Sequence, residues 1–280
     1  MPGTLYLVPT PIGNLGDISR RMADTLAAVD FIAAEDTRVT VKLLNHLGLK
    51  KPMVSYYRHN TGASGAAVLS RLLAGEDCAL VTDAGTPAVS DPGEELVAQC
   101  AAAGVSVVSI PGPCALVTAL AASGLPTGRF TFEGFLAMNK KNRRAHLEQL
   151  RGEQRTMLFY EAPHKLTATL RDLRDTFGPE RRISLCRELT KLHEEVRRTT
   201  LGEAAAWYEE NPPKGEFVLV VEGGCPPAED SATLEDGLAR LLALQGQGCS
   251  LKDAARQVAA ELGLPRKALY DRAVSSKKDE

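Results

Sequence analysis

The stretch from Leu80 to Gly93 reads L-V-T-D-A-G-T-P-A-V-S-D-P-G, and it sets the fold class of the chain around it. The apolar run 78–81 is typical of a buried strand, and it leads directly into Asp83. Glycines and prolines then interrupt regular structure until a helix begins near Glu94. Connections from strand to helix usually have about 2–6 residues. This longer, polar loop at the carboxyl end of a strand therefore predicts a ligand site on an open α/β sheet.

The chain before residue 111 alternates short apolar runs with helical patterns. This βαβα rhythm predicts a mostly parallel sheet with helices on both faces. The expected strands are 5–9, 31–34, 53–56, 78–82 and 105–110, and the expected helices are 18–29, 40–47, 63–74 and 94–103.

The chain after Pro111-Gly112-Pro113 has a different character, because strand candidates no longer alternate regularly with helices. We expect a mixed sheet in this second α/β domain, followed by a linker at 223–231 and a small helical unit that resembles a helix-turn-helix. The predicted domains are 1–120, 121–225 and 232–280. Expected strands are 130–135, 156–160, 182–187, 195–201 and 217–222; expected helices are 114–122, 143–150, 164–177, 202–210, 234–244, 251–262 and 266–274.

The composition is that of an ordinary globular protein, with 280 residues, 44% hydrophobic residues and a net charge of -2. No global basic field indicates nucleic acid, so local patches have to be considered. The six cysteines form no C-x-x-C pair, which favours reduced thiols in a cytoplasmic protein over disulfides or a zinc site. We expect no bound metal, no signal peptide and no membrane span.

Two further loops share the character of the first one. The loop 8–17 follows the first expected strand, and the loop 111–115 follows the fifth. Neither contains G-x-G-x-x-G or a Walker motif, and their prolines lack the N–H groups that a phosphate cradle needs. No Lys or Arg lies between Leu80 and Gly93. The loop 8–17 alone is equally consistent with a rigid connection, but three such loops on one sheet edge predict a shared pocket for a neutral or cationic ligand.

Eight ordered motifs carry a resemblance over essentially the whole chain. They are the Leu80–Gly93 loop, L-Y-L-V-P-T-P-I-G-N-L-G-D-I-S from Leu5, A-E-D-T-R from Ala34, S-Y-Y-R-H-N from Ser55, P-G-P-C-A-L-V-T-A-L-A-A-S-G-L-P from Pro111, F-E-G-F-L from Phe132, Y-E-A-P-H-K from Tyr160 and R-E-L-T-K-L-H-E-E from Arg187. The chain resembles the RsmI family of the tetrapyrrole-methylase superfamily, the small-subunit rRNA (cytidine ribose 2′-O) methyltransferases. It departs from the family where Cys114 replaces a more usual Ser and Arg58 a common acidic residue.

The resemblance implies two α/β domains of the tetrapyrrole-methylase type, with S-adenosylmethionine bound in the cleft between them. It also implies the small ribosomal subunit or its 16S rRNA as partner, and a homodimer. By motif position, the implied cofactor-binding residues are Pro11, Ile12, Asp83, Ala84, Gly85, Thr86, Cys114, Ala115 and Tyr160.

Methyl transfer to a ribose hydroxyl needs a positioned acceptor and is helped by a general base. The candidates for the base lie in the motifs near strand ends, and the sequence does not rank them: Glu35, Asp36, His59, Glu133, Glu188 and His193. An RNA partner needs local positive charge despite the net charge of -2. The candidates for RNA contact are Lys140, Lys141, Arg143, Arg144, Arg266 and Lys267.

Two other functions remain open at this stage. A porphyrinoid or protein methylase would keep the cofactor and change the acceptor, although the A-E-D-T-R and S-Y-Y-R-H-N segments and the C-terminal tail argue against it. A binding protein without chemistry would use only the helix-turn-helix-like tail to hold nucleic acid. Cofactor binding separates the second alternative from any enzyme.

Overall fold

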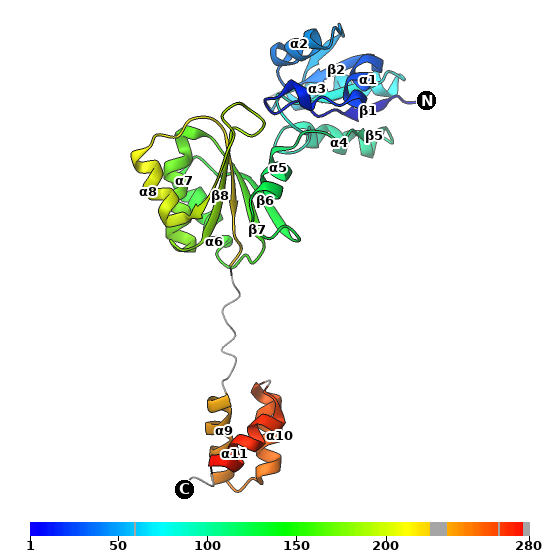
Figure 1. Ribbon diagram of the computed structural model, residues 1–280. Coiled ribbons are helices and arrows are strands. Elements are labelled where there is room, and N and C mark those ends of the chain that lie inside the picture. Colours follow the sequence, from blue (N-terminus) through cyan, green and yellow to red (C-terminus); the bar gives the residue numbers. More distant parts are fainter. Residues whose placement is uncertain (59, 225–233, 263, 277–280) are drawn as a thin grey trace. The chain divides into compact units, whose positions relative to one another are not determined.

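A computed structural model describes residues 1–280 except 59, 225–233, 263 and 277–280 (Figure 1). The chain forms two compact units, residues 1–224 and residues 225–280. The first unit contains two five-stranded sheets, and the described part of the second contains three helices. Most of the predicted linker 223–231 lies outside the described residues.

The first sheet is entirely parallel and has the strand order β3-β2-β4-β1-β5. This confirms the parallel sheet that the βαβα rhythm predicts. Since β4, β1 and β5 are neighbours, the loops that follow them emerge side by side at one edge. The strands are β1 (Thr4–Leu7), β2 (Phe31–Ala34), β3 (Met53–Ser55), β4 (Cys78–Val81) and β5 (Ser106–Ser109).

Helices cover both faces of the first sheet, because its central strands are apolar on both sides. Along β2, Phe31 and Ala33 belong to one buried cluster, with α3 and α4, while Ile32 and Ala34 belong to another, with α1 and α2. Neither face of this strand is left for solvent. The helices are α1 (Arg20–Ala28), α2 (Thr37–His46), α3 (Thr61–Leu73) and α4 (Gly93–Ala102), and a short 3₁₀ helix η1 (Leu15–Asp17) lies in the first loop.

The second sheet is mixed, as predicted, with the order β6-β7-β10-β8-β9. β10 runs antiparallel to β7 and β8, so it begins at the edge where those two strands end. In Figure 1, α7 and α8 lie on the opposite side of this sheet from α5 (Ala115–Ala122). The elements are β6 (Phe130–Phe135), β7 (Thr156–Glu161), β8 (Arg182–Arg187), β9 (Glu195–Thr200), β10 (Phe217–Val221), α6 (Lys140–Gln149), α7 (Pro163–Phe177) and α8 (Leu201–Glu210).

Helix α5 (Ala115–Ala122) connects the two sheets. It follows the last strand of the first sheet, yet Leu116 and Leu120 share a buried cluster with Leu158 and Val218 of the second. The domain boundary predicted between residues 120 and 121 falls inside this helix. Packing thus joins α5 to the second sheet, while its first turn begins at a loop of the first.

The C-terminal unit consists of α9 (Leu234–Gly246), α10 (Leu251–Leu262) and α11 (Arg266–Ser276). Its small core includes Leu241, Val258 and Leu269, all fully buried. The three helices were predicted from apolar spacing and from the turn before Pro265. None of the helices in the described parts of the chain has both the length and the apolar character needed to cross a membrane.

The contact between α6 and α7 includes a buried ion pair. The side chain of Asp172 is 5% exposed, and it accepts hydrogen bonds from Nε of Arg143 at 2.8 Å and Nε of Arg144 at 3.1 Å. Arg143 is itself 11% exposed, whereas Arg144 is 55% exposed.

We predict that Asp172→Ala lowers the free energy of unfolding by about 3–5 kcal/mol, because it leaves the Arg143 guanidinium buried without a counter-charge. Arg144→Ala removes only the exposed arm of the pair, so its expected cost is below about 1 kcal/mol. Urea denaturation followed by circular dichroism measures both. Equal midpoints for the two variants would contradict this assignment.

Candidate functional site

Hydrogen bonds join the three loops that follow β1, β4 and β5. The backbones of Thr10 and Gly85 pair in both directions, with N···O distances of 2.9 and 3.0 Å. The Thr86 hydroxyl donates to the carbonyl oxygen of Pro113 at 2.9 Å. The loop after β4 is therefore bonded to both of the other loops.

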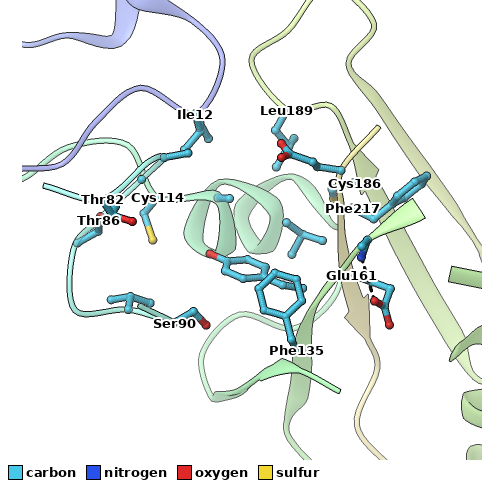
Figure 2. Close-up of a pocket in the computed structure, with 18 of the residues that line it drawn as sticks. Ile12, Thr82, Thr86, Ser90, Cys114, Phe135, Glu161, Cys186, Leu189 and Phe217 are labelled. Atoms are coloured by element: carbon cyan, nitrogen blue, oxygen red, sulfur yellow. Dashed lines mark hydrogen bonds between the residues drawn. The ribbon is translucent and has the colours of Figure 1, made fainter. Parts of the chain in front are cut away.

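The second sheet presents the ends of its own strands to the same space. Tyr160 and Glu161 come from the end of β7, Leu189 from the segment after β8, and Phe217 from the start of β10. In Figure 2 the labelled side chains of both sheets surround one cavity, with Ile12, Thr86 and Cys114 on one side and Phe217 and Leu189 on the other. The cavity has a volume of about 410 Å³, within the range typical of small-molecule sites.

Seven of the nine residues predicted to bind the cofactor line this cavity: Ile12, Ala84, Gly85, Thr86, Cys114, Ala115 and Tyr160. Pro11 and Asp83 do not. The Asp83 carboxylate instead accepts the backbone N–H of Asp36 at 3.1 Å, which ties the loop after β4 to the end of β2. Shielding from water, and then the nearby Glu35 carboxylate, raise the pKa of Asp83. Cofactor binding by all nine residues stays a prediction.

Acidic side chains dominate the charge of the cavity. Glu35, Asp91, Glu161, Glu188 and Glu216 line it, and among the described lining residues Lys191 supplies the single cation. The Lys191 ammonium donates to both Glu188 and Glu216, each at 2.9 Å, so it is largely neutralised. Such a lining favours a cationic ligand and repels a phosphate, as the lack of basic residues in the loops predicts.

Asp91 shapes the loop after β4 from within. Its carboxylate accepts the backbone N–H groups of Ala88 at 3.0 Å and Gly93 at 2.7 Å. Ala88 and Ser90 have positive φ values of 66° and 71°, a conformation that costs energy for residues with a Cβ. The Asp91 hydrogen bonds hold the backbone in this shape, and burial raises the pKa of the carboxyl group.

The segment after β8 contacts the first loop across the cavity. The Thr190 hydroxyl donates to the carbonyl oxygen of Ile12 at 3.2 Å. The aliphatic stem of Lys191 lies against Gly13, where an added Cβ would come within 2.5 Å of the lysine Cγ. Gly13 also has a φ of 123°, so both its backbone and its surroundings require glycine.

The structure separates the six candidate bases. Only Glu35 and Glu188 line the cavity among the five that the structure describes, and His59 lies outside the described residues. Asp36 caps α2 and pairs with Arg38, which lowers the pKa of its carboxyl group to about 2.

The other two candidates lie elsewhere. Glu133 bonds Nε2 of His146 at 3.0 Å instead of lining the cavity. His193 follows Lys191 on the same segment but is absent from the cavity wall.

Several residues that line the cavity were not predicted from the sequence. Phe135 and Lys191 belong to motifs at the carboxyl ends of strands, so the rule that placed the other loops could have found them. Glu216 precedes the start of β10, so that rule does not find it. Asp91 lies within the Leu80–Gly93 loop itself, but its inward direction depends on the positive φ values beside it.

Comparison with known families agrees with this geometry. The pattern of the family Tetrapyrrole (Corrin/Porphyrin) Methylases matches residues 4–205, and that of the RsmI C-terminal HTH domain matches residues 231–277. A protein of Synechocystis sp. named ribosomal RNA small subunit methyltransferase I is 50% identical over 268 residues, with 96% of each chain covered. The chain belongs to the RsmI family of tetrapyrrole methylases. A relative of the same name from Halalkalibacterium halodurans is 47% identical, covering 96% of this chain and 94% of its own.

Solved structures of tetrapyrrole methylases share the fold of this RsmI family member. The methyltransferase CobJ has a TM-score of 0.59 at 20% identity, over 79% of this chain and 95% of its own. Uroporphyrin-III C-methyltransferase from Thermus thermophilus, complexed with S-adenyl homocysteine, has a TM-score of 0.55 at 19% identity, over 79% and 97% of the two chains. At these identities the likeness extends to the fold alone.

The predicted basic residues of this family member fall into two groups. Lys140 and Lys141 are exposed in the first turn of α6, and Arg266 and Lys267 are exposed at the start of α11. Arg143 and Arg144 instead bond to Asp172, and the side chain of Arg143 is mostly buried. Arg143 thus has a structural contact that the charge pattern alone did not reveal.

We predict that Gly13→Ala lowers the free energy of unfolding by about 1–3 kcal/mol, because alanine is strained at this φ and its Cβ displaces Lys191. Gly62→Ala in α3 is the matched control, since an added Cβ meets open space there and is expected to be neutral or slightly stabilising. Urea denaturation compares the two. Equal effects would show that the contact between Gly13 and Lys191 is unimportant.

Proposed function

We propose that this protein transfers a methyl group from S-adenosylmethionine to the ribose 2′-hydroxyl of a cytidine in 16S rRNA of the small ribosomal subunit. The observation that carries the proposal is near-full-length identity of 50% to a protein named ribosomal RNA small subunit methyltransferase I. The acidic cavity between two α/β sheets is consistent with it. We further propose a cytoplasmic homodimer, organised as domains 1–120, 121–225 and 232–280.

The cavity fits S-adenosylmethionine in size and chemistry. This cofactor carries a sulfonium and an ammonium, which suit a wall containing Glu35 and Asp91. It carries no phosphate, in agreement with proline-rich loops that offer few N–H donors. The residues that would contact it are the seven predicted ones that line the cavity, whereas Pro11 and Asp83 would act only through the shape of their loops.

When bound, S-adenosylmethionine supplies an electrophilic methyl group on a good leaving group. The protein then has to exclude water, orient the ribose hydroxyl in line with the methyl carbon and accept a proton. The loops of the first sheet are bonded to one another and to the segment after β8, so they enter this task already ordered. Such preorganisation is the main contribution that the chain's own residues make.

We propose Glu35 as the group that accepts the hydroxyl proton. It lies at the end of β2 and lines the cavity. One carboxylate oxygen accepts the Thr82 hydroxyl at 2.5 Å, and the same oxygen lies 3.4 Å from the backbone N of Asp83. These contacts fix the carboxylate while its other oxygen makes no hydrogen bond within the described structure. Glu188 is a weaker candidate because Lys191 donates to it and lowers its pKa.

Methyl transfer from labelled S-adenosylmethionine tests the proposed function. Assembled small subunits and naked 16S rRNA are offered separately, and the labelled nucleoside is identified after digestion. We expect 2′-O-methylcytidine from one or both substrates. Label in another nucleoside, on a base or on ribosomal protein would overturn the assignment, and a protein that binds no cofactor in calorimetry would not be an enzyme of this class.

We predict that Glu35→Gln lowers kcat by about 10²–10⁴-fold, because the amide cannot accept the proton. Its affinity for S-adenosylmethionine should fall far less than kcat, since the amide oxygen still accepts from Thr82 and the other carboxylates of the cavity remain. Glu188→Gln should lower kcat by less than about tenfold. If the two variants lose kcat equally, or if Glu35→Gln retains it, Glu35 is not the base.

A further inference from the structure

A β-bulge in β6 changes the direction of a phenylalanine at the rim of the cavity. Phe132 pairs with Leu158 and Gly134 with Phe159, so Glu133 is an extra residue in the strand. Without it, residues three apart would point to opposite faces. With it, Phe132 and Phe135 both reach the ring of Tyr160, with centroid distances of 4.9 and 5.5 Å. Gly134 has a φ of 64°, which allows the bulge.

The three rings differ in how firmly they are held and how much of each is exposed. The Tyr160 hydroxyl accepts the backbone N–H of Leu116 at 3.2 Å, which fixes its ring against α5. Phe132 is partly buried beneath it. Phe135 lines the cavity and yet is 56% exposed, so much of its ring is open to a planar partner. A large exposed aromatic ring held in place at the mouth of a pocket suits stacking better than core packing.

The charge around Phe135 indicates what that partner is. The cavity beneath it is lined by carboxylates, which admit a base or a sugar and repel phosphodiesters. Three residues after Phe135 comes Met138, 76% exposed, and then Lys140 and Lys141, both exposed in the first turn of α6. The bulged residue Glu133 bonds His146 in the same helix at 3.0 Å. The β-bulge therefore directs the Phe135 ring to the cavity, and its extra residue bonds the helix that carries the two exposed lysines.

We propose that Phe135 is a stacking platform for the base of the nucleotide whose ribose enters the cavity, with Lys140 and Lys141 contacting the adjoining phosphates of a single-stranded RNA. This inference rests on the proposed function and names the surface that would receive its substrate. Stacking of a base on an aromatic side chain is sequence-tolerant and reads an unpaired nucleotide, because a base inside a duplex offers no free face.

The experiment compares Phe135→Leu, which keeps apolar bulk without an aromatic face, with Phe135→Tyr, which keeps the face. Phe130→Leu is the matched control, since Phe130 begins the same strand, is 40% exposed and does not line the cavity. The full-length protein is titrated into a short single-stranded RNA that carries a fluorescent cytidine analogue. S-adenosylmethionine affinity is measured by calorimetry, and the KM for the methylated rRNA substrate is measured in parallel.

We expect Phe135→Leu to weaken RNA binding and raise the KM by at least about fivefold, and to abolish quenching of the analogue. Phe135→Tyr and Phe130→Leu should stay within about twofold of wild type in RNA affinity. All three variants should keep their cofactor affinity within about twofold.

Three outcomes would overturn the inference. Unchanged RNA binding and KM in Phe135→Leu, while wild type methylates rRNA, would refute the platform and leave the proposed function standing. A parallel loss of cofactor affinity would place Phe135 against the cofactor instead. If the wild-type protein methylates no rRNA, the proposed function fails, and the inference fails with it.

Discussion

The paired backbone hydrogen bonds between Thr10 and Gly85 are the contact on which the rest of the site depends. They form because β1 and β4 are parallel neighbours that end at the same edge. Through Thr86 the same loop reaches the Pro113 carbonyl, and through Ile12 the first loop reaches the second sheet. If this pairing were lost, the three loops would each lose a partner that restricts their backbones, and ordering each loop would cost more conformational entropy.

A surface that suits a cationic methyl donor cannot also suit the phosphates of RNA, because the two ligands need opposite charges. Carboxylates within the cavity suit a cationic methyl donor, whereas RNA brings a chain of phosphates. The exposed lysines lie outside the cavity, at the start of α6, and the one lining lysine is paired with two glutamates. For the proposed RNA substrate, these lysines would attract the nucleic-acid backbone, while only the uncharged parts of a nucleotide would suit the interior.

Much of this arrangement could be predicted from the sequence, because strand ends and loop composition are local properties. The three loops were placed by apolar runs that end in Gly, Pro and Asp, and the bounds of β6 (Phe130–Phe135) and β8 (Arg182–Arg187) were predicted to the residue. What could not be predicted depends on partners distant in the chain. Arg143 looked like a free cation until Asp172 was found beside it, and Asp83 turned away from the cavity toward Asp36.

Helix α5 has a consequence for how this architecture can be recombined. Its first residues complete the pocket wall of the first sheet, and its apolar side completes the core of the second. A chimaera that joins the first sheet of one relative to the second sheet of another cannot cut through this helix without exposing Leu120 or replacing its partners. A crossover before Pro111 avoids this, and the third loop of the pocket is then carried with the second sheet. Such an exchange would transfer one segment of the cavity wall together with the second sheet.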